Sequence, residues 1–105
     1  MAGAILISEA VGVSLGTFPY RNVVEALRPF LEKRVPALIE ELYDPSETFN
    51  FIDVGEWSAA DFREFIAAAE EAFKDEMSHP EREGLRNAWQ EVLQSLHADP
   101  RASQG

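Results

Sequence analysis

The segment from Thr48 to Met77 constrains the fold most, because it reads as a strand, a turn and a helix in direct succession. Residues 49–54 are rich in β-forming side chains, and residues 59–77 repeat apolar side chains at helical spacing. Apolar residues on both faces of the strand favour an inner strand covered on both sides, or one that meets a partner with its second face. The rest of the chain is expected to pair with this strand or pack on this helix.

Two further strands are predicted near the N-terminus. Residues 4–8 form a continuous apolar run, and residues 11–15 alternate valine and leucine with glycine and serine. Glycine weakens a strand, so the second of these strands is expected at a sheet edge.

Three main helices are predicted, near residues 20–33, 58–77 and 80–97. Ser58 should cap the middle helix, with Asp61 three positions on, as in a capping box. The last helix should be broken by Asp99-Pro100, so residues 99–105 are expected to form a frayed C-terminal tail.

Prolines make the region between the first helix and the central strand harder to assign. Pro29 should kink the first helix or end and restart it. Residues 36–43 fit a short helix, although the same residues could form a strand hairpinned to residues 49–54. The sequence Asp-Pro-Ser-Glu at residues 44–47 is typical of a turn.

These elements predict a small α+β domain spanning residues 1–98, with a three-layer α/β arrangement as the alternative. The chain of 105 residues contains no cysteine, which excludes disulfides and thiolate metal sites and suits a cytoplasmic location. Its apolar runs are too short to cross a bilayer, and residues 4–7 lack the basic flank of a signal peptide.

Negative charge is concentrated in one part of the chain. Residues 40–83 hold 14 acids and three bases, whereas residues 1–34 hold three acids and four bases. This balance opposes direct binding to nucleic acid and to anionic membranes. It favours a basic protein as partner, which the negative field would steer into contact. The alternative is that the acids only keep the protein soluble.

Catalytic and metal-binding patterns are weak. The two histidines, His79 and His97, lie at opposite ends of the last predicted helix, about 25 Å apart at 1.5 Å per residue. They therefore cannot share a site within one chain. Glu76, His79 and Glu83 are close in sequence, but their spacing is unlike that of common metal sites. We predict neither a metal nor a cofactor.

Asp53 and Trp57 are the two most informative single residues. Asp53 ends the central strand, where burial would raise its pKa unless Arg21, Arg28 or Arg63 paired with it; the alternative is an exposed strand-end carboxylate. Trp57 has the position of a hydrophobic staple against Phe62, or of an exposed aromatic anchor among acids.

The size, composition and concentrated acidity resemble, at the level of composition alone, small immunity proteins that neutralise nuclease toxins. We therefore predict a non-enzymatic intracellular inhibitor of a basic protein. The alternatives are an accessory subunit of a complex, or a small enzyme or ligand-binding domain completed by homodimerisation, with its site around Asp53. The residues expected to bind the partner are Asp53, Glu56, Trp57, Asp61, Glu64, Glu71 and Asp75.

Overall fold

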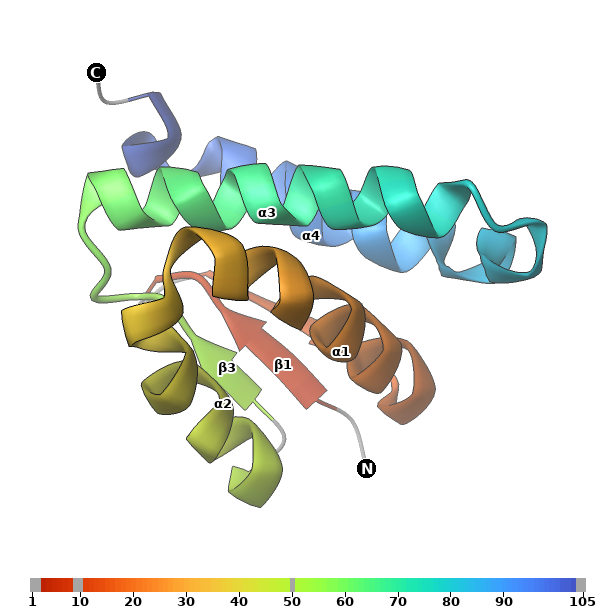
Figure 1. The fold of residues 1–105 in the computed structure, drawn as a ribbon, viewed down its shortest axis with the longest axis horizontal. Helices are drawn as coiled ribbons and strands as arrows, with labels where there is room; N and C mark the ends of the chain where they lie inside the picture. The colour runs from red at the N-terminus through yellow and green to blue at the C-terminus, as the bar shows by residue number, and fades with distance from the viewer. Residues whose placement is uncertain (1–2, 9–10, 50, 104–105) are drawn as a thin grey trace.

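A small mixed sheet and a set of helices make up the domain, which a computed structural model describes over residues 3–8, 11–49 and 51–103. The fold is α+β, as predicted (Figure 1). In chain order the elements are β1 (Gly3–Leu6), β2 (Gly12–Leu15), α1 (Thr17–Arg34), α2 (Pro36–Phe49), β3 (Phe51–Asp53), α3 (Ala59–Met77), the 3-10 helix η1 (Pro80–Leu85), α4 (Arg86–Ala98) and the 3-10 helix η2 (Pro100–Ser103).

The sheet has the order β2-β1-β3, so the first strand is the central one. β1 pairs antiparallel with β2, and parallel with β3, where Ile5 lies opposite Ile52. The glycine-containing β2 lies at an edge, as predicted. The prediction of an inner strand at residues 49–54 is wrong, because β3 forms the other edge and is only three residues long. Helix α2 extends to Phe49 and leaves little chain for this strand.

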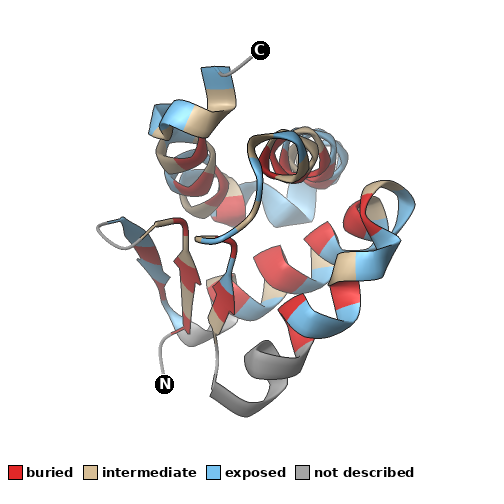
Figure 2. Cartoon of the chain, turned by 90° about the vertical axis from the view of Figure 1, so that its left-hand side faces the viewer, coloured by how far each residue is buried: buried red, intermediate tan, exposed pale blue. Residues whose placement is uncertain are grey.

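The two faces of the sheet differ in burial. Ile5, Ile52 and Val54 are fully buried on one face, whereas Leu6 and Phe51 on the other are only half-buried. Figure 2 shows buried residues alternating with less buried ones along the strands. On the buried side, α1 packs against β1 and α4 against β2. Coverage of one face supports the α+β assignment over the three-layer alternative.

Helix α1 runs without a break through Pro29. Its buried residues Val23, Leu27 and Leu31 lie on both sides of this proline, and the helix packs along α3. Burial of this apolar stripe outweighs the hydrogen bond that proline removes. The expected restart of the helix at Pro29 is therefore wrong.

Helix α2 begins at Pro36, where the missing N–H of proline is tolerated in the first turn. The helical interpretation of residues 36–43 is confirmed, and the hairpin alternative is not. The turn predicted at residues 44–47 is wrong, because the helix continues to Phe49. The Tyr43 hydroxyl donates a 2.7 Å hydrogen bond to the Val24 carbonyl and ties α2 to α1.

Helix α3 confirms its predicted cap, because the Ser58 hydroxyl accepts a 3.2 Å hydrogen bond from the Asp61 amide. The buried surface of α3 is wider than the apolar face predicted from its helical repeat, because it also includes Ala68, Ala72 and Glu76. The small alanine side chains allow neighbouring helices to approach closely. The helix packs against both α1 and α4.

The C-terminal region differs from prediction in two places. Ser78 closes α3, with its hydroxyl donating to the Asp75 carbonyl, directly before the helix predicted at residues 80–97. That predicted helix begins as the 3-10 helix η1 and becomes α-helical only at Arg86. Of the tail expected to be frayed, residues 100–103 form η2, and residues 104–105 lie outside the described residues. The Arg101 side chain is only 15% exposed and bonds to the residue after β1, to the loop after β3 and to Asp99.

Candidate protein-binding surface

The loop after β3 is held in a fixed turn by its own polar groups. The Asp53 carboxylate accepts a 2.8 Å hydrogen bond from the Gly55 amide, and the Trp57 amide donates to the Val54 carbonyl at 3.2 Å. A Cβ at Gly55 would lie 3.0 Å from the Asp53 carboxylate oxygen, so glycine permits this close approach. Asp53 is exposed at the end of the strand, as the simpler of its two interpretations predicts.

Trp57 lies half-buried at the end of this loop, directly before the Ser58 cap. Its ring packs edge-on against Phe65, with the ring centroids 5.7 Å apart. The predicted hydrophobic staple placed Trp57 against Phe62, whereas the ring contact in the structure is with Phe65, one helical turn further along α3. The contact with Phe65 anchors one edge of the indole and leaves part of it accessible.

A hollow of about 1130 Å³ opens beside this loop. It lies between α2, the ends of β1 and β3, and the first turn of α3, so segments far apart in sequence build its walls. The lining residues are Leu6, Ser8, Leu38, Glu41, Leu42, Phe51, Asp53, Gly55, Glu56, Trp57, Ser58 and Asp61.

Four of the predicted partner-binding residues line this hollow: Asp53, Glu56, Trp57 and Asp61. Glu41 of α2 joins them, so the charged residues of the lining are four acids and no base. Apolar side chains from α2, from the two strands and from the loop line the same hollow. Such a surface can bury the apolar part of a ligand while it binds lysine or arginine through charge-assisted hydrogen bonds.

Glu64 and Glu71 lie apart from the hollow, on the side of α3 that faces the end of α1. Arg34 bridges them: its Nη1 donates to Glu64 at 3.1 Å, and its Nη2 donates to Glu71. These hydrogen bonds, first that of Glu71 and then that of Glu64, raise the pKa of Arg34 above its ordinary value. Two of the predicted partner-binding carboxylates thus have a cation within the domain.

Asp75 is exposed near the far end of α3, beside a second, smaller hollow between α1 and η1. The same hollow contains Glu76, which is 4% exposed and lies 3.3 Å from the Arg82 guanidinium. The seven predicted residues therefore fall into three places, of which only the hollow brings several together.

The structure does not assemble the alternative sites considered above. Among the residues that it describes, no group of three His, Asp or Glu side chains is arranged to hold a metal ion. The three candidate ligands diverge: Glu76 meets Arg82, His79 meets Glu81 and Glu83 meets Arg86. The lining around Asp53 includes neither histidine nor arginine. Within the described residues, no helix is long and apolar enough to cross a bilayer.

Glu41 of the lining and Arg101, which lies outside the lining and bonds to the loop, are two residues that the sequence did not single out. Glu41 could have been found from the spacing of Leu38 and Leu42, which places all three on neighbouring positions of one helical surface. Arg101 lay in a segment without any periodic pattern, so nothing local pointed to it.

Comparison with known proteins gives a shared fold. The chain matches no family model and no curated protein sequence. It is similar to a chain from the solved complex of a CdiA-CT toxin from Burkholderia pseudomallei with its cognate CdiI immunity protein. The TM-score is 0.90 at 22% sequence identity, over 97% of this chain and 100% of that chain. This likeness shows that the two chains have the same fold over nearly their whole length.

Proposed function

We propose that this protein is an inhibitor of the immunity type, which acts in the cytoplasm by binding a basic toxin domain in the hollow between α2 and the β3–α3 loop. The observation that carries the proposal is the composition of this hollow, where four carboxylates have no base among the lining residues. Negative charges gathered on a concave surface favour a ligand of opposite sign.

The apolar residues of the hollow supply the second part of the interaction. Leu38, Phe51 and Trp57 are half-buried, so each has surface left that a partner could cover. Tryptophan surrounded by polar residues is typical of the residues that dominate binding energy in protein interfaces. Steering by the acids would set the association rate, and burial of Trp57 would slow dissociation.

The fold comparison supports a toxin–immunity pair as the biological setting, since the similar chain comes from such a complex. The net charge of −10 supports the immunity side of the pair. An acidic inhibitor can neutralise a basic toxin by occupying the cationic groups with which the toxin would hold its own target.

The test compares two triple variants that remove the same amount of charge. The hollow variant carries Glu41→Gln, Asp53→Asn and Glu56→Gln, and the side-chain amide oxygen at position 53, the last residue of β3, can still accept the hydrogen bond of the Gly55 amide. The control variant carries Glu40→Gln, Glu81→Gln and Glu91→Gln at exposed positions outside the hollow. Each immobilised protein is used to capture partners from the native host, and bound proteins are quantified by mass spectrometry.

We expect the wild type and the control variant to retain the same basic protein, and the hollow variant to lose it. The captured protein should stop growth when expressed alone and should be neutralised by co-expression of the wild type. Equal retention of that protein by the two triple variants would overturn the assignment of the hollow. A captured protein that is acidic, or that leaves growth unchanged, would overturn the inhibitor function.

A further inference from the structure

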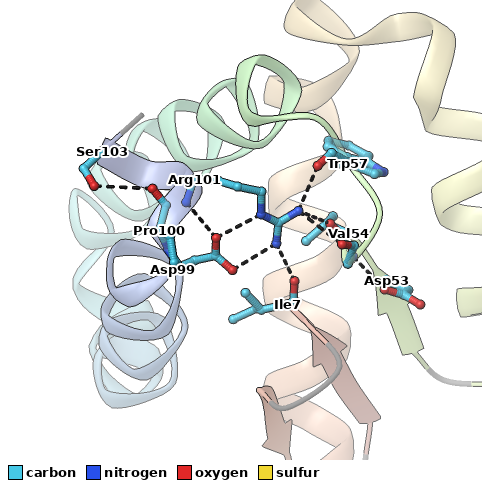
Figure 3. A network of polar contacts seen from close by, with 9 residues as sticks. Ile7, Asp53, Val54, Trp57, Asp99, Pro100, Arg101 and Ser103 are labelled. Atoms are coloured by element: carbon cyan, nitrogen blue, oxygen red, sulfur yellow. Dashed lines mark hydrogen bonds and ion pairs between the residues drawn. The ribbon is translucent and has the colours of Figure 1, made fainter. Parts of the chain in front are cut away.

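The loop that carries Glu56 and Trp57 is held from the far end of the chain by Arg101 (Figure 3). The Nη1 atom of Arg101 donates to the carbonyls of Val54 and Trp57, each at 2.9 Å, and lies 3.4 Å from the Gly55 carbonyl. These contacts reach both ends of the turn next to the hollow.

The remaining donors of the guanidinium are also used. Nη2 donates to the Ile7 carbonyl at 2.6 Å, and Nε and Nη2 donate to the two oxygens of the Asp99 carboxylate at 2.9 and 3.0 Å. A guanidinium has five N–H donors in a fixed plane, and here each has an acceptor. The guanidinium carbon also lies 3.9 Å from the centroid of the Phe62 ring.

Asp99 orients this side chain from its own segment. Its carboxylate accepts from the Arg101 amide at 2.9 Å as well as from the guanidinium, and its side chain is only 8% exposed. The arginine is therefore fixed on one edge by a carboxylate and on one face by an aromatic ring. The N–H groups that Asp99 does not bind donate to the carbonyls of the loop and of Ile7, the residue after β1.

We propose that Arg101 is a positioning residue for partner binding: it holds the Val54–Ser58 loop in the shape that presents Glu56 and Trp57 to the hollow. The proposal rests on the proposed function of the hollow. A loop that is already ordered loses less conformational entropy when a partner binds, so affinity depends on a residue that lies outside the lining. If loosening left about one molecule in ten with the loop in place, the Kd would rise about tenfold.

The first experiment needs no partner. Arg101→Lys keeps the positive charge but loses the planar fork, and Arg86→Lys is its matched control, because Arg86 makes a similar two-point contact to Glu83 on an exposed surface. Amide hydrogen exchange is measured by NMR at Gly55 and Trp57, whose N–H groups are bonded within the turn. We expect exchange to be about tenfold faster there in Arg101→Lys, with core amides of α3 unchanged.

General destabilisation would accelerate the core amides and the loop amides together, so this pattern separates positioning from a purely structural role. Unchanged exchange at Gly55 and Trp57 would overturn the proposal. If Arg101→Lys fails to fold, Asp99→Asn tests the same arrangement, because it keeps Arg101 but removes the carboxylate that orients it.

The second experiment measures the Kd of each variant for the basic protein captured by the wild type. We expect an increase of about tenfold for Arg101→Lys and none for Arg86→Lys. A faster-exchanging loop with unchanged Kd, while the hollow variant has lost binding, would overturn the positioning role alone. Normal binding by the hollow variant would overturn the proposed function and the binding role of Arg101 with it, whereas the loop exchange would still report the contact.

Discussion

Arg34 at the end of α1 donates to the Glu64 carboxylate of α3 at 3.1 Å. One positive charge therefore lies against the acidic stripe of α3, which consists of the predicted partner-binding residues Glu64, Glu71 and Asp75. Glu71 bonds to the same guanidinium. The stripe is therefore partly neutralised within the domain, whereas the lining of the hollow has no such base. The two acidic regions should respond differently to the removal of charge.

We predict that Glu71→Gln leaves partner affinity within about twofold of the wild type, while Asp53→Asn weakens it by about tenfold or more, as expected for a charge pair in a partner contact. The Arg34 pair is substantially exposed, so its loss should cost less than ~1 kcal/mol of stability. Surface plasmon resonance at two salt concentrations and chemical denaturation provide the measurements. A larger loss of affinity in Glu71→Gln than in Asp53→Asn would favour the stripe as the binding face.

Trp57→Ala should act on dissociation more than on association. The indole is half-buried against Phe65 and carries no charge, so it contributes contact area at the hollow without long-range attraction. We expect the off-rate to rise about tenfold or more, corresponding to ~1.4 kcal/mol or more of binding energy, with an on-rate close to that of the wild type. An unchanged off-rate would mean that the ring only anchors the loop.

The core should depend strongly on Trp89 and Phe62, which are both fully buried. Trp89→Ala and Phe62→Ala should each cost ~3–5 kcal/mol of unfolding free energy, because each leaves a cavity. The Trp89 indole N–H has no hydrogen-bond acceptor among the described residues. Trp89→Phe removes this unpaired donor and should cost less than ~2 kcal/mol. Denaturation in urea measures all three, and a loss of similar size in Trp89→Phe and Trp89→Ala would contradict this explanation.

Acid should loosen the C-terminal segment through Asp99. The hydrogen bond from the Arg101 guanidinium is the main cause that holds the pKa of Asp99 below its ordinary value of 3.8. A carboxyl with a lowered folded-state pKa contributes stability above its unfolded pKa and loses it as the pH falls through the folded value. The melting temperature of the wild type should therefore fall below about pH 4 more steeply than that of Asp99→Asn. Parallel curves between about pH 5 and 2 would show that Asp99 does not contribute to the acid transition.

Tyr43 should behave in the opposite sense at alkaline pH. Burial raises the pKa of its phenol above the ordinary value of 10.0, and the hydroxyl donates to the Val24 carbonyl. Its contribution to stability is complete below the unfolded pKa and is lost as the pH rises toward the folded value. Tyr43→Phe should cost ~1 kcal/mol at neutral pH and lose stability less steeply above pH ~10. Ultraviolet absorbance should show no Tyr43 phenolate near pH ~10 while the protein stays folded.

The parts of the fold that local sequence determines were predictable. The Ser58 cap and the apolar repeat of α3 depend on residues within a few positions of one another, and both appear in the structure. Asp53, Glu56, Trp57 and Asp61 follow one another closely in sequence, so their shared position at the hollow could also be anticipated.

The errors came from contacts between distant segments. Pro29 and the Asp-Pro-Ser-Glu run at 44–47 are local signals for breaks, yet α1 and α2 run on through them. Glu76 was considered only as a weak metal-ligand candidate with His79 and Glu83, but the return of the chain at η1 buries it beside Arg82. Glu41 reaches the hollow only because α2 packs against β3. The spacing of Leu38, Glu41 and Leu42 indicates a shared helical surface, but no spacing indicates which distant segment packs against it.

The contacts of Arg101 also set a sequence of events during synthesis. The arginine follows Trp57 by 44 residues and Ile7 by 94, so the loop is made long before its anchor. At about 5–20 residues per second, the ribosome needs roughly 2–9 s to add the residues between Trp57 and Arg101. During this interval the carbonyls of the loop lack their guanidinium donor. The turn beside the hollow can therefore reach its final form only after Arg101 has been added.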